Sequence, residues 1–184
     1  MVTECKIKGE ELMGQSILYY DKFQKQKWSF YIVATEEGLC YVGSQNRGIG
    51  EVESWMKKSY PHATLTQNSM KLKEYVVQLE QYVNGERKQF DFPITSDGTP
   101  FQLAVWKELQ NIPYGETRSY SEIATAINKP KAVRAVGSAI GANPLTIIVP
   151  CHRVISKSGK LSGFRGGIEM KKMLLELENN EKTI

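Results

Sequence analysis

Residues 119–142, SYSEIATAINKPKAVRAVGSAIGA, decide how the second half of the chain is expected to fold. Ser119 and Glu122 have the spacing of a capping box, which predicts a helix start, and the Lys129-Pro130 pair interrupts the helical pattern. A second short helix is predicted within a few residues of that break. Two short helices joined by a tight turn predict a helix-turn-helix, although most helical hairpins of this length only pack a core.

The second predicted helix is almost free of large side chains, and Arg134 is the one long side chain in its middle. Each glycine inside a helix lowers helix stability by about 1 kcal/mol relative to alanine. We therefore expect that the glycines of this helix serve packing or function. The pattern fits either close approach to a groove that Arg134 enters or close packing against another helix. The small residues are Ala132, Ala135, Gly137, Ser138, Ala139 and Gly141.

A further helix is predicted just upstream, in the stretch TPFQLAVWKELQNIPYG. Thr99 and Gln102 form another capping box, and Pro100 takes the first helical position, where proline is favoured. This helix is expected to end before Pro113, because the residue that precedes a proline is disfavoured in the helical conformation.

The first half of the chain combines extended and helical patterns. The stretches at 16–23 and 28–44 are rich in aromatic and β-branched residues and predict antiparallel strands, with a turn at residues 36–38. In residues 70–86, MKLKEYVVQLEQYVNGE, apolar residues recur at helical spacing and predict a helix. These patterns indicate a small α/β domain with an antiparallel sheet.

A stretch without periodicity, FPITSDGTP, separates the two halves and is rich in proline, glycine and hydroxyl residues. We therefore predict an N-terminal α/β domain over residues 1–92, a linker over 93–98 and a mainly helical domain over 99–184. The expected fold class is α+β with two domains.

Composition narrows the class of protein. The chain has 184 residues, of which 41% are hydrophobic and 24% charged, as in ordinary globular proteins. No apolar run approaches the roughly 20 residues that span a bilayer, and the first residues show no signal peptide. Three cysteines without CxxC spacing argue against a disulfide framework. We expect a cytoplasmic protein with no membrane association.

Positive charge is concentrated in the second half of the chain. The net charge is only +4, but residues 100–165 carry nine Lys and Arg against three Asp and Glu. Such a basic region is compatible with binding to a polyanion. A solvated, lysine-rich surface explains the charge alone equally well.

Cys151 stands in the stretch LTIIVPCHRV, which predicts a buried strand that ends at Pro150. It can be a nucleophile, a metal ligand, half of a disulfide or a small core residue, and the last is the most common fate of a free cysteine. A reactive cysteine needs a lowered thiol pKa, which a nearby cation or histidine supplies. His152 and Arg153 follow directly, and these polar neighbours favour a thiolate nucleophile over core packing.

The motif PCHRV, together with AVRAVGSAIGANP before it and SGKLSGFRGGIEMKKMLLELE after it, resembles the active-site region of the O6-alkylguanine-DNA alkyltransferases. The resemblance runs continuously from about Thr99 to Glu178, whereas the N-terminal half agrees only in size and pattern. It implies a ribonuclease-H-like N-terminal domain and a C-terminal domain with a winged helix-turn-helix.

The resemblance also implies a reaction and a set of catalytic residues. In that family a cysteine takes the alkyl group from O6 of guanine in double-stranded DNA, irreversibly and once per protein molecule; O4-alkylthymine is a possible second substrate. Cys151 would be the acceptor, His152 the base acting through a water, and Glu178 the group that orients His152. Asn143 would hydrogen-bond around the site, and Tyr120 would donate a proton toward the guanine.

The resemblance also implies which residues contact DNA and which form a pocket for the base. The lesion lies inside the duplex, so the guanine must be rotated out, and Arg134 would enter the minor groove in its place. The small residues Ala135, Gly137 and Ser138 would permit the close approach, and Tyr120 would also contact the DNA. Val154, Phe164 and Arg165 would line the base pocket. Phe164 stands where several family members have tyrosine, and Arg165 stands where some have a small residue and would narrow the pocket.

No cofactor or metal is expected. Some family members carry a structural zinc in the N-terminal domain, but Cys5, Cys40 and His62 do not make a convincing set of four ligands. The chain is expected to act as a monomer.

Two other functions remain possible from the sequence. One is a DNA-lesion sensor that binds without repair, although relatives of that kind lack the cysteine and usually the N-terminal domain. The other is a cysteine hydrolase or thiol redox enzyme that uses Cys151 and His152 and has no need of Arg134.

Overall fold

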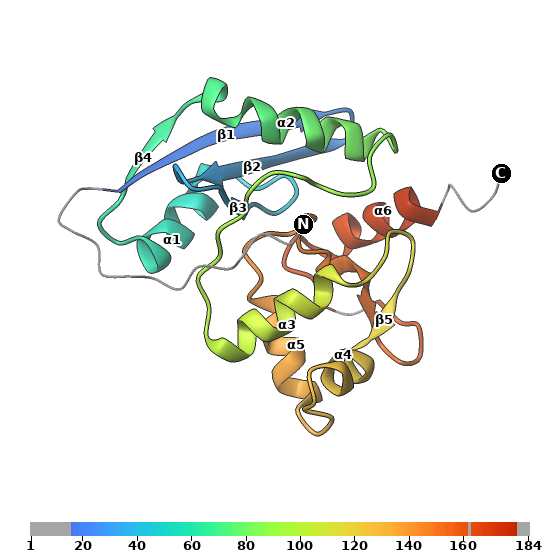
Figure 1. Cartoon of the computed structure of the whole chain (residues 1–184). Coiled ribbons are helices and arrows are strands. Elements are labelled where there is room, and N and C mark those ends of the chain that lie inside the picture. Colours follow the sequence, from blue (N-terminus) through green and yellow to red (C-terminus); the bar gives the residue numbers. More distant parts are fainter. Residues whose placement is uncertain (1–15, 162, 180–184) are drawn as a thin grey trace. The chain divides into compact units, whose positions relative to one another are not determined.

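The computed structural model describes residues 16–161 and 163–179 (Figure 1). The chain divides into two compact units, of which the first ends at Asp97 and the second begins at Gly98. Cys5, expected to be a thiol, lies outside the described residues.

The first unit contains a four-stranded sheet in the order β3-β2-β1-β4. The predicted antiparallel pairing is confirmed for β1 with β2 and for β2 with β3, and the turn expected at residues 36–38 separates the last two. The prediction of an antiparallel sheet is wrong for β4, which pairs with β1 in parallel. The strands are β1 (Ile17–Lys25), β2 (Trp28–Ala34), β3 (Leu39–Val42) and β4 (Thr64–Gln67).

A helix that the sequence patterns did not identify explains the parallel strand. A parallel strand requires a crossover connection, and α1 (Ile49–Ser59) supplies it between β3 and β4. The helix predicted in residues 70–86 is confirmed as α2 (Ser69–Val83), where the Asn68 side chain accepts a hydrogen bond of 3.0 Å from the Lys71 amide as an N-cap. Figure 1 shows α1 and α2 on opposite sides of the sheet.

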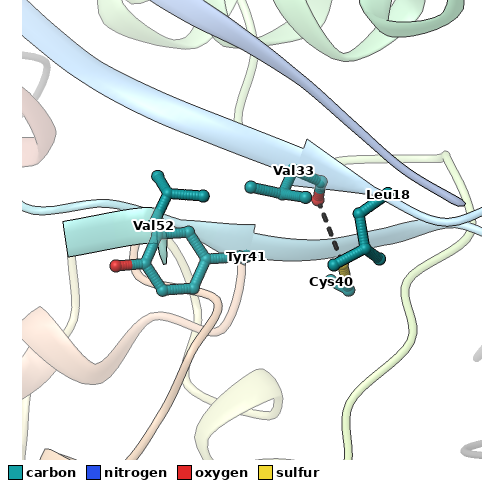
Figure 2. Close-up of a cluster of buried hydrophobic side chains, with 5 residues drawn as sticks. All are labelled: Leu18, Val33, Cys40, Tyr41 and Val52. Atoms are coloured by element: carbon teal, nitrogen blue, oxygen red, sulfur yellow. Dashed lines mark hydrogen bonds between the residues drawn. The ribbon is translucent and has the colours of Figure 1, made fainter. Parts of the chain in front are cut away.

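Helices on both faces explain why β3 is buried at every position and β2 at most of its own. Figure 2 shows part of this core, where the Cys40 sulfur points toward the Val33 carbonyl oxygen at 3.3 Å. Cys40 is 1% exposed and is a free thiol. It therefore behaves as a small core residue. The cluster consists of Leu18, Val33, Cys40, Tyr41 and Val52.

The second unit contains the three predicted helices, two of which were predicted from capping boxes. Both capping boxes are formed, at the start of α3 (Pro100–Gln110) and of α4 (Tyr120–Ala126). After a short turn, α5 (Val133–Gly141) packs against both of them. The Trp106 indole donates a 2.8 Å hydrogen bond to the Ala139 carbonyl and ties α3 to α5.

The buried strand predicted before Cys151 does not form. Residues 146–148 make turns, and Ile147 has a positive φ of 76°. The Asn143 side chain directs this path, since its Oδ1 accepts from the Leu145 amide at 3.0 Å and its Nδ2 donates to the Val149 carbonyl at 3.0 Å. Apolar runs of this length do not distinguish a strand from a buried turn, and here the side chain of Asn143 decides between them.

The chain then forms a short 3₁₀ helix, η1 (Cys151–Arg153), followed by β6 (Val154–Ile155), which pairs in parallel with β5 (Arg118–Ser119). The last helix is α6 (Ile168–Asn179), which contacts η1. Among the residues that the structure describes, no helix has the length and apolarity needed to cross a membrane.

Candidate active site

Cys151 begins η1 directly after Pro150 and is 2% exposed. Its sulfur accepts a hydrogen bond of 3.2 Å from Nδ2 of Asn143. Asn143 is itself fully buried and hydrogen-bonds to the backbone on both sides of the turn, so its amide is held rigidly. The reactive atom of the motif is therefore fixed by one buried side chain.

Burial raises the pKa of the Cys151 thiol to about 11. The hydrogen bond from Asn143 and the positive charges of Lys171 and Arg165 act in the opposite direction, but they do not outweigh burial. The resting thiol is therefore protonated at neutral pH. This corrects the sequence-based expectation of a lowered pKa, because that expectation considered neighbouring charges without the cost of enclosing a thiolate.

A buried ion-pair network lies behind the cysteine. Nε2 of His152 and Oε1 of Glu178 are 2.9 Å apart, and the Arg153 guanidinium donates to both oxygens of the same carboxylate at 2.9–3.2 Å. The Gly115 amide donates to Oε2 of Glu178 at 2.9 Å, and Nη1 of Arg153 reaches the Ile112 carbonyl. Glu178 thus joins α6 to η1 and to the loop after α3.

The network determines which groups are charged. Burial alone would raise the pKa of Glu178, but hydrogen bonds and charge from His152 and Arg153 hold it well below its usual range. Burial lowers the pKa of His152, although the hydrogen bond with Glu178 opposes this. Glu178 is therefore ionised and His152 neutral at pH 7. Because Nε2 faces an ionised carboxylate, it carries the ring proton, and Nδ1 is the basic nitrogen.

Lys171 is a member of the site that the sequence motif did not indicate. It is fully buried on α6, and its ammonium donates a 2.5 Å hydrogen bond to the Val154 carbonyl. Burial lowers the pKa of Lys171, and the charge of an ionised Cys151 would raise it. The sequence does hold a signal for it, since Lys171 and Glu178 share the inward face of α6 with Leu174.

The predicted pocket residues lie around this centre. Val154 is buried in β6, and the ring of Phe164 stands edge-on to the His152 imidazole with centroids 6.5 Å apart. Nη1 of Arg165 donates to the Asn143 carbonyl at 3.1 Å. The backbone carbonyls of Cys151 and Val154 each already accept one internal hydrogen bond. A carbonyl oxygen has a second lone pair, so both can still accept from a ligand.

The residues predicted to meet DNA lie on the outer face of the helix-turn-helix. Arg134, Ala135 and Ser138 are exposed on α5, and Gly137 is half-buried next to the ring of Tyr120. The side of α5 that packs inward consists of Val136, Ala139 and Ile140. Helix packing therefore accounts for Ala139 but not for the small residues on the exposed side, which leaves a flat face around one projecting arginine.

The other possibilities for Cys151 are weaker in this geometry. Cys151 is a free thiol, as is Cys40. Within residues 16–161 and 163–179 no three His, Cys, Asp or Glu side chains gather in a way that would hold a metal ion. Unlike Cys40, whose sulfur sits among hydrophobic side chains, the Cys151 sulfur contacts an amide and lies near two cations.

Two family models match the chain, one for each unit. The model described as "6-O-methylguanine DNA methyltransferase, ribonuclease-like domain" matches residues 18–95, and "6-O-methylguanine DNA methyltransferase, DNA binding domain" matches residues 100–180. The first description agrees with the ribonuclease-H-like topology that the sequence resemblance implied.

Curated relatives and solved structures agree with these models. The inducible methylated-DNA–protein-cysteine methyltransferase of Bacillus subtilis is 55% identical over 90% of this chain and 93% of its own length. The methylated-DNA–protein-cysteine methyltransferase of Methanosarcina acetivorans is 43% identical over 89% of this chain and 99% of its own. A crystal structure of Mycobacterium tuberculosis OGT in complex with DNA superposes with a TM-score of 0.76 at 40% identity, covering 88% of this chain and 93% of that one.

Proposed function

Because the chain belongs to the 6-O-methylguanine DNA methyltransferase family, we propose that it repairs DNA by transferring the alkyl group from O6 of guanine to Cys151. The observation that carries this proposal is the buried sulfur of Cys151, held by Asn143 and backed by the His152–Glu178 pair. A helix-turn-helix with an outward-facing Arg134 belongs to the same unit.

The reaction is a displacement at a saturated carbon. The Cys151 sulfur forms a bond to the alkyl carbon while the bond from that carbon to O6 breaks, and its electron pair leaves with the guanine. The thiol proton is lost from sulfur, and one proton is gained by the guanine ring, so the products are a thioether and an ordinary guanine. Because the thioether is not cleaved, each protein molecule reacts once.

We propose that His152 removes the thiol proton through a bridging water. Nε2 of His152 is engaged with Glu178, so the proton is received at Nδ1. The imidazolium that forms is stabilised by the ionised carboxylate of Glu178, which Arg153 and the Gly115 amide already hold in position. A base that is oriented by a carboxylate is the general arrangement for activating a thiol.

The departing guanine requires a donor, since it leaves as an anion. We assign this role to Tyr120, the first residue of α4, which stands beside Gly137 on the face of the helix-turn-helix. Lys171 would favour the thiolate through its charge. This role was not expected from the motif.

We propose that α5 enters the minor groove and that Arg134 takes the place of the rotated base. The exposed small residues Ala135 and Ser138 support this arrangement, since a flat helix face can approach the groove closely. Rotating a base out of the duplex costs a few kcal/mol and less at a damaged pair, which favours lesions. O4-alkylthymine remains a candidate second substrate.

The proposed function carries two further expectations. We propose that the protein acts as a monomer and that it needs no cofactor. We propose that the protein acts in the cytoplasm, on DNA that is located there.

The deciding experiment is mass spectrometry after incubation with a duplex that carries one O6-methylguanine. We expect a gain of one CH₂ per protein molecule, located on the peptide that contains Cys151, and no gain with unmodified duplex or with Cys151→Ala. A methyl group found on Cys5 or Cys40 would make the assignment of the acceptor wrong.

The same experiment separates the alternatives. Binding of the lesion without any gain of mass would identify a lesion sensor. Repeated turnover on an ester, peptide or peroxide, without modification of the protein, would identify a cysteine hydrolase or redox enzyme. The presence of Cys151 in a prepared site disfavours the first, and the exposed Arg134 face on α5 disfavours the second.

A further inference from the structure

A tight hairpin follows β6, and we name its residues 156–160 the wing. The Gly159 amide donates to the Ser156 carbonyl at 2.9 Å, and the Ser156 amide and hydroxyl both donate to the Lys160 carbonyl, at 3.3 and 2.8 Å. Gly159 has a φ of +77°, a conformation that favours glycine. These bonds fix the backbone of the wing, so its side chains project from a defined base.

The pairing of β6 with β5 places the wing next to the first turn of α4. The two strands are parallel, so both leave their sheet at the same end, where Ser119 of β5 lies opposite Ile155 of β6. The next residue after β5 is Tyr120, which begins α4, and the next residue after β6 is Ser156, which begins the wing. Tyr120 also borders Gly137 on α5. The wing therefore stands beside the residue that borders the proposed DNA-binding face.

The wing carries two exposed lysines in a part of the chain that has no acidic residues. Lys157 and Lys160 are both exposed, and no Asp or Glu occurs between Glu122 and Glu169. Within residues 16–161 and 163–179, neither lysine side chain has a carboxylate partner. Two positive charges on one short hairpin without a counter-charge favour binding to a polyanion.

A second pair of exposed lysines, Lys129 and Lys131, lies in the turn between α4 and α5. This pair follows the last turn of α4, whereas the wing adjoins the first, so the helix separates the two pairs. Because α4 has 7 residues, it is about 10 Å long. The minor groove of DNA is about 6 Å wide. The two pairs are thus far enough apart to meet the phosphates on both sides of a groove that α5 enters.

We propose that the wing is a second DNA-contact surface, in which Lys157 and Lys160 bind backbone phosphates and supply affinity that does not depend on a lesion. This inference rests on the proposed function, which places only α5 and Tyr120 at the DNA. Phosphate contacts position a protein on the duplex and carry no sequence information. A repair protein has to bind undamaged DNA while it searches for a lesion, and the wing meets that need without touching a base.

The test measures the dissociation constant for an undamaged, fluorescein-labelled duplex by fluorescence anisotropy, in KCl between about 50 and 200 mM. Each phosphate contact to double-stranded DNA contributes about 0.9 to the slope of the logarithm of affinity against the logarithm of salt concentration. In the double variant Lys157→Ser, Lys160→Ser, we expect the magnitude of this slope to fall by about 1.8. The fold-loss of affinity should then be about 12 times larger at the lowest salt concentration than at the highest.

The matched control replaces two other exposed lysines of the same unit, Lys107 of α3 and Lys172 of α6, with serine. It changes the net charge by the same amount as the wing variant. It therefore separates phosphate contacts made by the wing from a general effect of charge on DNA binding, and its slope should equal that of the wild type.

Each outcome decides a different statement. A wild-type slope in the wing variant, or an equal loss of slope in the wing and control variants, overturns the role of the wing while leaving the repair function intact. Failure of the wild type to take up a methyl group from O6-methylguanine in duplex DNA overturns the proposed function itself. If the double variant does not fold, as judged by circular dichroism, the single variants Lys157→Gln and Lys160→Gln must each lower the slope by about 0.9.

Discussion

The resting thiol of Cys151 should react with soluble electrophiles far more slowly than an ordinary cysteine. Only the thiolate is nucleophilic, and enclosure in the site raises the pKa of Cys151 to about 11. At pH 7.5 such a thiol is ionised in about 3 of 10,000 molecules, whereas a free thiol with a pKa of about 8.5 is ionised in about 1 of 10. Ionisation alone therefore predicts labelling about 300-fold slower than that of glutathione, before the lack of exposure is counted.

The assay is iodoacetamide labelling of the Cys151 peptide, followed by mass spectrometry between pH 7 and pH 10, with glutathione as the reference thiol. Because the folded-state pKa is raised, the logarithm of the rate should increase by about one for each pH step of one across this range. A rate within tenfold of glutathione at pH 7.5, or a plateau below pH 9, would show a thiolate that exists before DNA binds. The structural account of the site would then be wrong.

Three further predictions concern the groups behind the cysteine. Glu178→Gln leaves the buried Arg153 without a counter-charge, so we expect about 3–5 kcal/mol lower stability in urea unfolding and slower methyl transfer. Lys171→Met removes a charge that favours the thiolate, so it should slow methyl transfer. It also leaves the Val154 carbonyl without this donor, which should lower the free energy of unfolding by less than about 3 kcal/mol. Burial lowers the pKa of His152, so the stability that its neutral form contributes is complete above pH 6.5 and is lost as the pH falls. In a His152→Gln variant, the free energy of unfolding should no longer show this loss at low pH. An unchanged pH dependence would contradict a neutral, buried imidazole.

Local signals in the sequence were sufficient to predict α3 and α4, the first two helices of the second unit. The capping boxes at Thr99 and Ser119 depend on residues three positions apart, so they can be recognised without knowledge of the tertiary fold. The parallel strand β4 carried no such signal. Its residues are mostly exposed, and its partner β1 is more than 40 positions away in the chain, so only the completed sheet reveals the pairing.

Local sequence patterns did not predict the conformation of the segment that leads to Cys151. Residues 145–149 are apolar except for Thr146 and were expected to form a strand, but the side chain of Asn143 hydrogen-bonds to the backbone at both ends of the segment and turns it. Asn143 has this role because it is buried in the folded protein, and the spacing of residues in the sequence does not show that burial. Lys171 was missed for a related reason, since a lysine on a helix is usually solvated and only its register with Leu174 places it inside.

Burial keeps the resting thiol of Cys151 protonated. A protonated thiol suits an acceptor that reacts only once. A preformed thiolate at Cys151 would be alkylated by any small electrophile, and each such event would remove one repair molecule permanently. Enclosure keeps the sulfur neutral, while His152, Lys171 and Arg165 lie ready to stabilise the charge when a base is in place. On this argument the low resting reactivity of Cys151 protects a protein that can react only once, and the sulfur becomes reactive when a bound base places the alkyl carbon beside it.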